Sequence, residues 1–319
     1  MKLLYITSSL PFGPGEAFII HELEALIRLG HDILLIPMYP RGQLSHQEAH
    51  EFLDRTVVQP LLSAKVACGA FRVLAGRPLT VVRTTFLCAK TRSLRCMIKN
   101  LVAHPKALWL AELATRWGAD HIHAHWAATS ATVAMVASEA TGIPWSFTAH
   151  RGDIVQNNLL REKLARATFS RFISESGLDL ARSLGINNSE GRPIVLHMGV
   201  ALPEATPTSQ PAKPSPFVVL CPANLLPVKG HRYLIEAVEL LRRRGVDVVL
   251  QIVGEGPLRK ELEARVNAAS LDRVVSFLGH KPHEELMGMY RKGDVHTVVL
   301  PSVDLGGGLH EGIPVSLIE

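Results

Sequence analysis

The sequence has 319 residues, 47% of them hydrophobic and 20% charged, a composition typical of globular proteins and long enough for about two domains. The net charge is +5, and no apolar run approaches the ~20 residues that a membrane-spanning helix needs. The first nine residues are too short and too rich in hydroxyls for a signal peptide, and the four cysteines lack metal-ligand spacing, which favours a cytoplasmic protein with reduced thiols.

The chain opens with a strand–helix–strand pattern. We expect a strand over 2–8, a turn over 11–16, an amphipathic helix that ends near residue 30 and a buried strand over 31–37. This pattern predicts an α/β fold with a doubly wound parallel sheet. Ligands of such sheets bind at the carboxyl ends of the strands, so we expect Gly13, Gly15 and Glu16 to face the ligand-binding cleft. The turn lacks the Gly-x-Gly-x-x-Gly spacing of dinucleotide-binding proteins, which argues against a dehydrogenase.

A basic segment follows a short strand expected near 56–58. Between Arg55 and Ala111 the chain has ten basic residues and no Asp or Glu: Arg55, Lys65, Arg72, Arg77, Arg83, Lys90, Arg92, Arg95, Lys99 and Lys106. Apolar residues alternate with these cations over helix-length stretches, so we predict basic amphipathic helices over 61–117. Such helices suit an anionic membrane surface or an anionic acceptor. Solvated basic faces are the alternative, and a nucleic-acid partner is disfavoured because no binding module accompanies the charge.

Three histidines follow one another at a spacing of two. The strand expected over 120–124 carries His121 and His123, and His125 comes at its carboxyl end, so all three share one face. Three histidines so placed could bind zinc, but helices cover both faces of a parallel strand and no nearby Cys or carboxylate completes a tetrahedral set. We therefore predict no metal, and we expect His125, at the carboxyl end of the strand, to reach the ligand-binding cleft.

The next strand, over 144–148, leads to the sequence Ala149-His-Arg-Gly-Asp153. His150 follows the strand directly, where binding and catalytic groups of α/β sheets collect. Strands near 171–174 and 193–196 complete a first domain, 1–200. The segment 201–216 is rich in proline and is predicted to be a linker, so the second domain spans 217–319.

The second domain repeats the alternation. We expect strands over 217–221, 248–253, 274–278 and 294–300, with helices between them. Lys229 lies in the turn after the first of these strands, at a helix start, where an ammonium and the helix dipole together neutralise a diphosphate.

The last nineteen residues contain three glycines, Gly306, Gly307 and Gly308, followed by Glu311 and Glu319. Pro314 suits the first turn of a helix, which places Glu311 on the loop and Glu319 within the helix. The glycines let the main chain approach a phosphate, and a carboxylate suits a pair of neighbouring hydroxyls, such as those of a sugar or a ribose. An ordinary glycine-rich loop with two solvated glutamates is the alternative.

These residues carry a resemblance to a family. Two glutamates separated by seven residues, preceded by Pro301-Ser302 and with Gly312 directly after the first, resemble the signature of the family-4 retaining glycosyltransferases. The resemblance implies the GT-B fold, with two Rossmann-like doubly wound domains facing a cleft and the second domain incomplete. A family member would continue for another strand or two and a helix beyond Glu319, so we expect a C-terminally truncated fragment.

The resemblance also implies roles for single residues. Glu311 holds the donor sugar, Glu319 holds the nucleotide ribose and His150, in a segment similar to the family's, lies beside the scissile bond. Where the family commonly has an arginine for the diphosphate, this chain has Asn224. The implied catalytic residues are His150 and Glu311, and the implied site residues are, for the donor, Lys229, Asn224, Gly306, Gly307, Gly308, Glu319, Gly13 and Gly15 and, on the acceptor side, Glu16, His125 and Asp153.

The implied activity is retaining transfer of a sugar from a nucleotide-diphosphate sugar to a saccharide acceptor, without metal or other cofactor, in cell-surface polysaccharide biosynthesis. The basic helices favour a polyprenyl-linked acceptor and a cytoplasmic protein that is peripheral on the inner face of the plasma membrane; a soluble sugar acceptor is the rival. A noncatalytic nucleotide-sugar-binding protein or an inactive truncated fragment is the alternative from another class. An epimerase or phosphorylase of the same fold is disfavoured because the spacing of the glutamates is typical of transferases.

Overall fold

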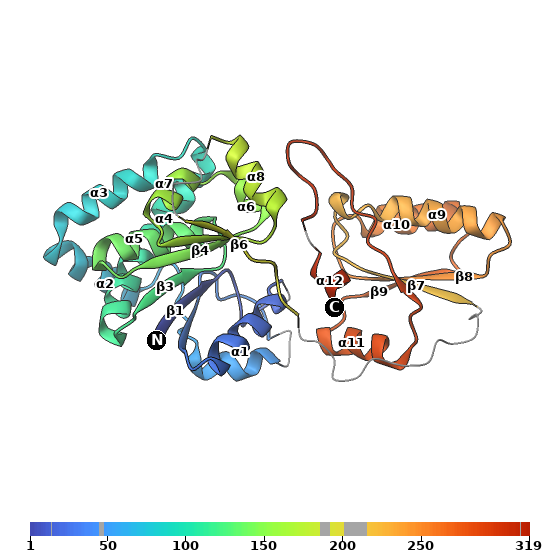
Figure 1. The fold of residues 1–319 in the computed structure, drawn as a ribbon, viewed down its shortest axis with the longest axis horizontal. Helices are drawn as coiled ribbons and strands as arrows, with labels where there is room; N and C mark the ends of the chain where they lie inside the picture. Colours follow the sequence, from blue (N-terminus) through green and yellow to red (C-terminus); the bar gives the residue numbers. More distant parts are fainter. Residues whose placement is uncertain (14, 45–47, 186–191, 201–215, 313) are drawn as a thin grey trace. The chain divides into compact units, whose positions relative to one another are not determined.

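The computed structural model describes residues 1–13, 15–44, 48–185, 192–200, 216–312 and 314–319. The chain divides into two compact units, Met1–Gly199 and Val200–Glu319, and each is described by itself (Figure 1). The predicted linker lies outside the described residues except for Pro216.

The N-terminal unit is built on a six-stranded sheet whose paired strands all run parallel. Its strands are β1 (Lys2–Thr7), β2 (Asp32–Pro37), β3 (His121–Ala124), β4 (Trp145–Ala149), β5 (Phe169–Phe172) and β6 (Pro193–Val195). Their order in the sheet is β2-β1-β3-β4-β5-β6, which confirms the predicted parallel α/β fold. The order reverses between β1 and β3, and such a switch point is where open parallel sheets bind their ligands.

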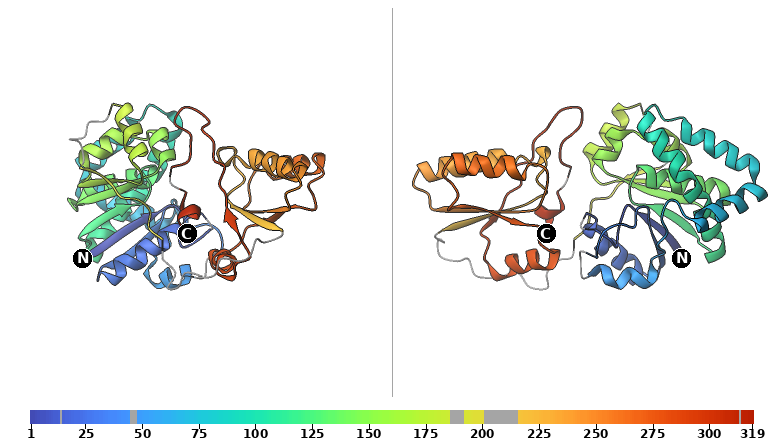
Figure 2. Two further views of the ribbon diagram at one scale, coloured as in Figure 1. Left: turned by 45° about the vertical axis from the view of Figure 1, so that its right-hand side comes forward. Right: turned by 180° about the vertical axis from the view of Figure 1, so that it is seen from behind.

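Helices cover both faces of this sheet, which Figure 2 shows from two further sides. Alternate residues of β1 face opposite cores: Leu4 and Ile6 pack with the helices of one side, and Leu3 and Tyr5 pack with those of the other. The first core involves α4 (Leu94–Trp117), α5 (Thr129–Thr141), α7 (Leu160–Arg166) and α8 (Glu175–Ser183). The second involves η1 (Ala17–Ile19), α1 (Ile20–Arg28) and η2 (Glu48–Arg55), while α6 (Arg151–Gln156) follows β4.

The predicted basic segment forms α2 (Ala64–Gly76), α3 (Pro78–Ala89) and the long helix α4. Ser63 and Ser93 begin α2 and α4 by accepting backbone N–H groups two to three residues into the helix, and Gly118 ends α4 in the left-handed conformation. The short strand expected near 56–58 is only an isolated bridge between Thr56 and Leu35, so that prediction was wrong in extent. No helix among the described residues is both long and apolar enough to cross a membrane.

All four cysteines are free. Cys68 lies exposed on α2, whereas Cys88, Cys96 and Cys221 are buried. Burial raises the pKa of the Cys88 and Cys221 thiols to about 12, which keeps these two groups protonated.

The C-terminal unit has a four-stranded parallel sheet in the order β10-β7-β8-β9. Its elements are β7 (Phe217–Pro222), η3 (Pro227–Lys229), α9 (His231–Arg243), β8 (Val248–Val253), α10 (Arg259–Ala268), β9 (Val275–Gly279), α11 (His283–Lys292), β10 (Thr297–Val298) and α12 (Val315–Ile318). The helices α9 and α10 pack on one face of the sheet and α11 on the other. Here the strand order reverses between β7 and β10.

Two predicted elements near the end of the chain differ from the structure. The strand expected over 294–300 contains only Thr297 and Val298, because it pairs with β7 alone, at the edge of the sheet. The helix at Pro314 is one turn long with Pro314 as its N-cap, so Glu319 follows the helix instead of lying inside it.

Candidate functional site

The structure brings two of the predicted residues into contact at the switch point of the C-terminal sheet. Lys229 ends η3 on the loop after β7, and Glu311 lies on the loop after β10. The Lys229 Nζ and a Glu311 carboxylate oxygen are 2.5 Å apart, and both side chains are partly exposed, at 19% and 25%. An ammonium and a carboxylate therefore stand side by side at the position where parallel sheets bind ligands.

Glycines allow these loops to approach one another. Gly230 has a φ of +68°, and a Cβ atom there would lie 1.9 Å from the Pro301 carbonyl oxygen. The Val303 N–H donates to the Val228 carbonyl at 2.9 Å, which ties the two loops together. Only glycine fits at position 230, and its close approach sets the position of the segment that carries Glu311.

A second close approach fixes the loop that contains Asn224. A Cβ at Gly254 would lie 2.2 Å from the Ala223 carbonyl oxygen, and a Cβ at Gly256 would lie 2.6 Å from the Leu225 carbonyl oxygen. Both glycines follow β8, the strand next to β7, and their close contacts fix the position of the loop after β7.

Glu319 contacts a residue that the sequence analysis did not single out. Its carboxylate lies 3.0 Å from the Nε2 of His283, the first residue of α11, and only 11% of the Glu319 side chain is exposed. No motif in the sequence marks His283. The role of Glu319 toward a ribose stays a prediction.

The three glycines of the last loop form a turn. Gly306, Gly307 and Gly308 all have positive φ values, of 81°, 60° and 84°, which L side chains rarely adopt. The Gly306 N–H donates to the Asp304 carboxylate at 2.8 Å. The turn geometry explains why glycine stands at these positions, and their binding of a phosphate stays a prediction.

In the N-terminal unit, Glu16 holds the loop after β1. The residue is 3% exposed, and its carboxylate accepts from the backbone N–H groups of Ser8, Ser9 and Leu10 at 2.9, 2.5 and 2.8 Å. It also accepts from the indole N–H of Trp126. Both oxygens are thus engaged with the protein. Of the two glycines predicted beside it, Gly13 has a φ of +74° and Gly15 is exposed.

His125 and His150 meet at the carboxyl ends of neighbouring strands. Their Nε2 atoms lie 3.0 Å apart, and the ring of Trp126 packs against His150 with 4.4 Å between the centroids. Burial lowers the pKa of His150 to about 4 and that of His125 well below its usual value, so both rings are neutral near pH 7.

Asp153 fixes the backbone around this pair. Its carboxylate accepts from the N–H of Ala127 at 3.0 Å and from the N–H of His150 at 3.3 Å. Burial raises its pKa to about 6, since a carboxylate loses solvation there. The structure therefore gathers three of the predicted residues, His125, His150 and Asp153, into one cluster.

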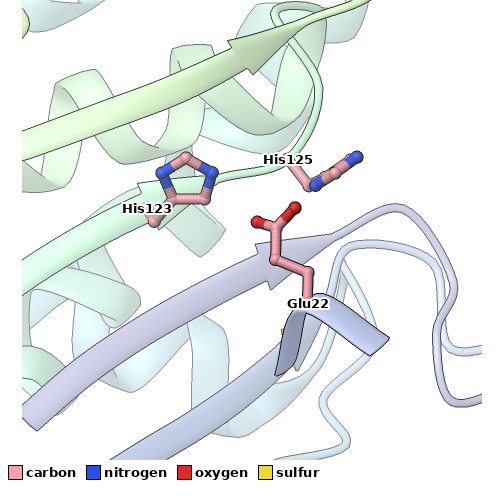
Figure 3. A group of neighbouring side chains, drawn as sticks. All are labelled: Glu22, His123 and His125. Atoms are coloured by element: carbon pink, nitrogen blue, oxygen red, sulfur yellow. The ribbon is translucent and has the colours of Figure 1, made fainter. Parts of the chain in front are cut away.

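A carboxylate does lie beside the histidines, contrary to the sequence-based expectation. Glu22 of α1 approaches His123 and His125, and the potential ligand atoms of the three residues lie within 4.8 Å of one another (Figure 3). The Glu22 oxygens accept from the Tyr5 hydroxyl at 2.8 Å and pair with Arg171 at 2.5 Å. His123 in turn is bonded to the hydroxyls of Ser146 and Thr148. Each of the three residues is thus already engaged with a protein partner.

Part of the chain is similar in sequence to known glycosyltransferases. Residues 204–319 match the family model described as glycosyl transferases group 1. The chain is 35% identical over 125 residues to WcaL of Escherichia coli (strain K12), which is named as a colanic acid biosynthesis glycosyltransferase. The matched residues make up 39% of this chain and 30% of WcaL. The chain is 23% identical to the amylovoran biosynthesis glycosyltransferase AmsK of Erwinia amylovora, over all of this chain and 80% of that protein.

Among solved structures, the chain resembles the lipopolysaccharide outer core galactosyltransferase WaaB in its apo form. The TM-score is 0.63 at 14% identity, with all of this chain and 77% of that chain covered. At this identity the likeness shows the fold, which is the GT-B fold of glycosyltransferases. Residues 204–319, which include the Lys229–Glu311 pair, thus match the family model of the glycosyl transferases group 1, and the chain has the GT-B fold.

Proposed function

We propose that the protein is a retaining glycosyltransferase that takes its sugar from a nucleotide-diphosphate sugar. The observation that carries this proposal is the Lys229–Glu311 pair, 2.5 Å apart at the switch point and inside the segment that matches the family model. A diphosphate needs a cation and a sugar diol needs an acceptor of hydrogen bonds, and this pair offers both in one place.

Each residue of the pair has a separate task in the reaction. Breaking the bond between sugar and phosphate builds negative charge on the leaving diphosphate, which Lys229 neutralises. One preorganised donor of this kind contributes about 3 to 4 kcal/mol to the stabilisation of a transition state. Glu311 accepts from sugar hydroxyls and orients the anomeric carbon. Because Lys229 supplies the positive charge, we propose a reaction that needs no metal.

Two substitutions separate these tasks. Lys229→Met should weaken the binding of a nucleoside diphosphate and lower kcat/KM by about 100-fold or more. Glu311→Gln keeps the side-chain shape, so the nucleoside diphosphate should still bind while transfer of the sugar is lost. Lys260→Met, an exposed lysine on α10, is the matched control and should change neither.

Calorimetry with a panel of nucleoside diphosphates and their sugars measures binding, and NMR of the product anomer measures transfer and its stereochemistry. Inversion at the anomeric carbon would contradict the retaining mechanism, and loss of activity with a chelator would contradict metal independence. Binding without turnover would favour a noncatalytic nucleotide-sugar-binding protein instead. If Lys229→Met binds nucleoside diphosphates and transfers sugar as well as the wild-type protein does, the proposal is wrong.

For the reaction as a whole we propose a role in exopolysaccharide biosynthesis, with a saccharide acceptor linked to a polyprenyl lipid. The names of the relatives WcaL and AmsK support the first part. The structure supports the second through the surface of α2, α3 and the start of α4, here called the basic face. His150, at the carboxyl edge of the N-terminal sheet, is the catalytic residue that we propose for this unit.

The basic face combines apolar and cationic side chains. Phe71, Leu79, Phe86, Leu94 and Ile98 are each more than half exposed. Leu79 and Phe86 are seven residues apart on α3 and Leu94 and Ile98 four apart on α4, so each pair lies on one side of its helix, and Phe71 adds a further apolar side chain on α2. Arg92, Arg95 and Lys99 stand among them and are exposed as well. An apolar stripe flanked by cations fits the interface of an anionic bilayer, so we propose a cytoplasmic protein that is peripheral on the inner face of the plasma membrane.

The basic cluster predicted from the sequence is smaller in the structure. Lys106 is fully buried, Arg72 pairs with Glu112 at 2.7 Å, and Arg83 pairs with Glu139. A test should therefore replace Arg92, Arg95 and Lys99 together by Gln. We expect wild-type protein to sediment with phosphatidylglycerol vesicles but not with phosphatidylcholine vesicles. We expect the triple variant to sediment with neither.

The control replaces three arginines of the C-terminal unit, Arg242, Arg243 and Arg244, by Gln. This change removes the same charge from another exposed surface, so it should leave vesicle binding nearly intact. Equal loss in both variants would mean that net charge, not the basic face, attracts the vesicles. Unchanged binding of the first variant at low salt would contradict the membrane proposal and favour a soluble sugar acceptor.

A further inference from the structure

A chain of hydrogen bonds runs beneath the N-terminal sheet and ends at His150. It begins with Arg171 and Glu22, which are paired at 2.5 Å, and continues to the Tyr5 hydroxyl at 2.8 Å. Tyr5 lies 2.8 Å from the Nδ1 of His125, and the Nε2 of His125 lies 3.0 Å from the Nε2 of His150. Five side chains from separate elements are thus joined in series.

The topology explains why these residues meet. Tyr5 lies on β1, Arg171 on β5 and Glu22 on α1, while His125 and His150 follow β3 and β4. The strands are neighbours in register, with Tyr5 opposite His123 and Thr148 opposite Arg171. Arg171 is 7% exposed, and its guanidinium also donates to the carbonyls of Leu196 and His197, at 2.9 Å each.

The chemistry of the first two members gives the chain a direction. Arg171 only donates hydrogen bonds, and an ionised carboxylate only accepts them. Burial raises the pKa of Glu22, but the charge of Arg171, the neighbouring His123 and the hydrogen bonds from Arg171 and Tyr5 together outweigh burial and hold the pKa below its usual value. Glu22 is therefore ionised, and the proton of Tyr5 points to it. The Tyr5 oxygen is left as an acceptor on its other side.

The same argument places the remaining protons. Because Tyr5 accepts, His125 donates from Nδ1–H, and a neutral ring with its proton on Nδ1 has a bare Nε2. The bare Nε2 of His125 accepts, so His150 donates from Nε2–H. The titratable and charged groups that face these two rings are Tyr5 from β1, Glu22 from α1, Arg171 from β5 and His123 from β3.

Asp153 fixes the backbone of His150 at the start of α6. The Asp153 carboxylate accepts from the His150 N–H at 3.3 Å, and the Asp153 N–H donates to the His150 carbonyl at 3.0 Å. These contacts hold the main chain that carries the ring, and the contact with His125 decides which ring nitrogen carries the proton.

We infer that Arg171, Glu22, Tyr5 and His125 are positioning residues that hold His150 as a neutral ring with its proton on Nε2. The Nε2–H of this ring is then held by His125. His150 offers a ligand a fixed, uncharged surface, and it has no free proton to donate as a general acid. The catalytic importance of the chain rests on the proposed function of His150, whereas the position of the protons does not.

The proton positions are measured by long-range 1H–15N NMR of the full chain, in which the two neutral tautomers give different patterns. His125→Asn and His150→Asn variants assign the signals. In wild-type protein near pH 7 we expect the Nδ1–H form for His125 and the Nε2–H form for His150. A charged His150, or His150 with its proton on Nδ1, would overturn the inference without any further variant.

Tyr5→Phe removes the one oxygen that joins Glu22 to His125. We expect the ring of His125 to shift toward the Nε2–H form that predominates in water, and the signals of His150 to change with it. Ser146→Ala is the matched control, because Ser146 bonds His121 and His123 on the same buried face and touches no member of the chain. If Tyr5→Phe does not fold, Glu22→Gln keeps the shape while removing the charge that orients the tyrosine proton. Tautomers that stay as in the wild type in the folded variant would contradict the inference.

Kinetics separate this inference from the proposed function. If both hold, kcat of Tyr5→Phe should fall about 10-fold to 100-fold, the range for partners that orient a functional histidine, with a smaller change in KM. The acid limb of the pH profile should not follow the titration of His150. The expected tautomers in a protein without transferase activity would remove the proposed function and leave the inference standing.

Discussion

Two buried lysines in the N-terminal unit each bind three backbone carbonyl oxygens. Lys106 donates to the carbonyls of Pro37, Met38 and Gln59 at 2.7, 2.9 and 2.8 Å. Lys163 donates in the same way to the carbonyls of Ala127, Ala128 and Asn158. These side chains bind carbonyls where a strand ends or a helix begins, and the Ala128 carbonyl also accepts from the Thr132 N–H. Burial lowers the pKa of Lys106 to about 8, so it remains largely charged at pH 7.

Lys106→Met keeps the apolar stem and removes all three donors. The carbonyls of the loops after β2 and η2 would lose their partner in a buried place, so we expect the free energy of unfolding to fall by about 2 kcal/mol or more. Urea unfolding followed by tryptophan fluorescence measures this loss, because all four tryptophans lie in the N-terminal unit.

Lys99→Met is the matched control, since Lys99 is an exposed residue of the same helix, α4. It should change the free energy of unfolding by less than about 0.5 kcal/mol. Equal effects of the two substitutions would contradict the structural role of Lys106.

At the scale of single residues, the sequence predicted the members of local motifs and missed the partners from distant segments. Lys229 and Glu311 followed from turn chemistry and from spacing. Glu22, Tyr5 and Arg171 carry no local signal, and Glu22 and Arg171 are 149 residues apart. Lys106 looked like the other cations of its segment, because a regular pattern of charges does not tell which side of a helix is covered.

At the scale of elements, two glycines that flank α9, Gly230 before it and Gly245 after it, act by different physical effects. Gly230 and Gly245 have similar φ values, of +68° and +75°, but only Gly230 has atoms in the place of a Cβ. Alanine at Gly245 would lower the free energy of unfolding only because its backbone must stay left-handed, which costs about 1 to 2 kcal/mol. Alanine at Gly230 would also displace the segment that carries Glu311.

We therefore expect Gly230→Ala to lower the free energy of unfolding more than Gly245→Ala and to weaken nucleoside diphosphate binding. Circular dichroism during urea unfolding measures the first effect, and calorimetry measures the second. Similar losses in both variants would mean that backbone conformation, and not the contact with Pro301, decides the effect at Gly230.

Most strands were predicted from alternation and turn residues to within one or two positions. The exceptions are edge elements. The strand over 56–58 and the last strand, expected over 294–300, have β character in their residues, but each has a sheet neighbour on one side only. Sequence patterns report burial, whereas the extent of a strand depends on how many residues a neighbour pairs.

At the scale of the whole molecule, buried titratable groups of the N-terminal unit make its stability depend on pH. Burial lowers the pKa of His121, His123 and His150 to about 4 each, against about 6.5 for an unfolded histidine. Between these values the unfolded chain binds more protons than the folded one, so the free energy of unfolding falls as the pH drops from about 6.5 to 4.

Asp153 acts in the opposite direction, because burial raises its pKa to about 6 and the folded chain then holds its proton more tightly. Three histidines outweigh one carboxyl, so urea midpoints from tryptophan fluorescence should be lower near pH 5 than near pH 7. His121→Gln removes one titrating group and should reduce the difference. A midpoint that rises toward pH 5 would contradict this account.

The division into two parallel-sheet units was within reach of the sequence, because each half repeats the alternation of strand and helix. The expectation that the chain is a fragment stays a prediction. The buried polar chain beneath the first sheet was out of reach, since its members meet only when six strands are in register.

The single exposed thiol has a practical consequence. Cys68 lies on α2, within the basic face, while the other three cysteines are buried. A maleimide dye should therefore attach at this one position of the unmodified chain. Its emission would then report directly whether that surface leaves water when vesicles are added, with no engineered handle.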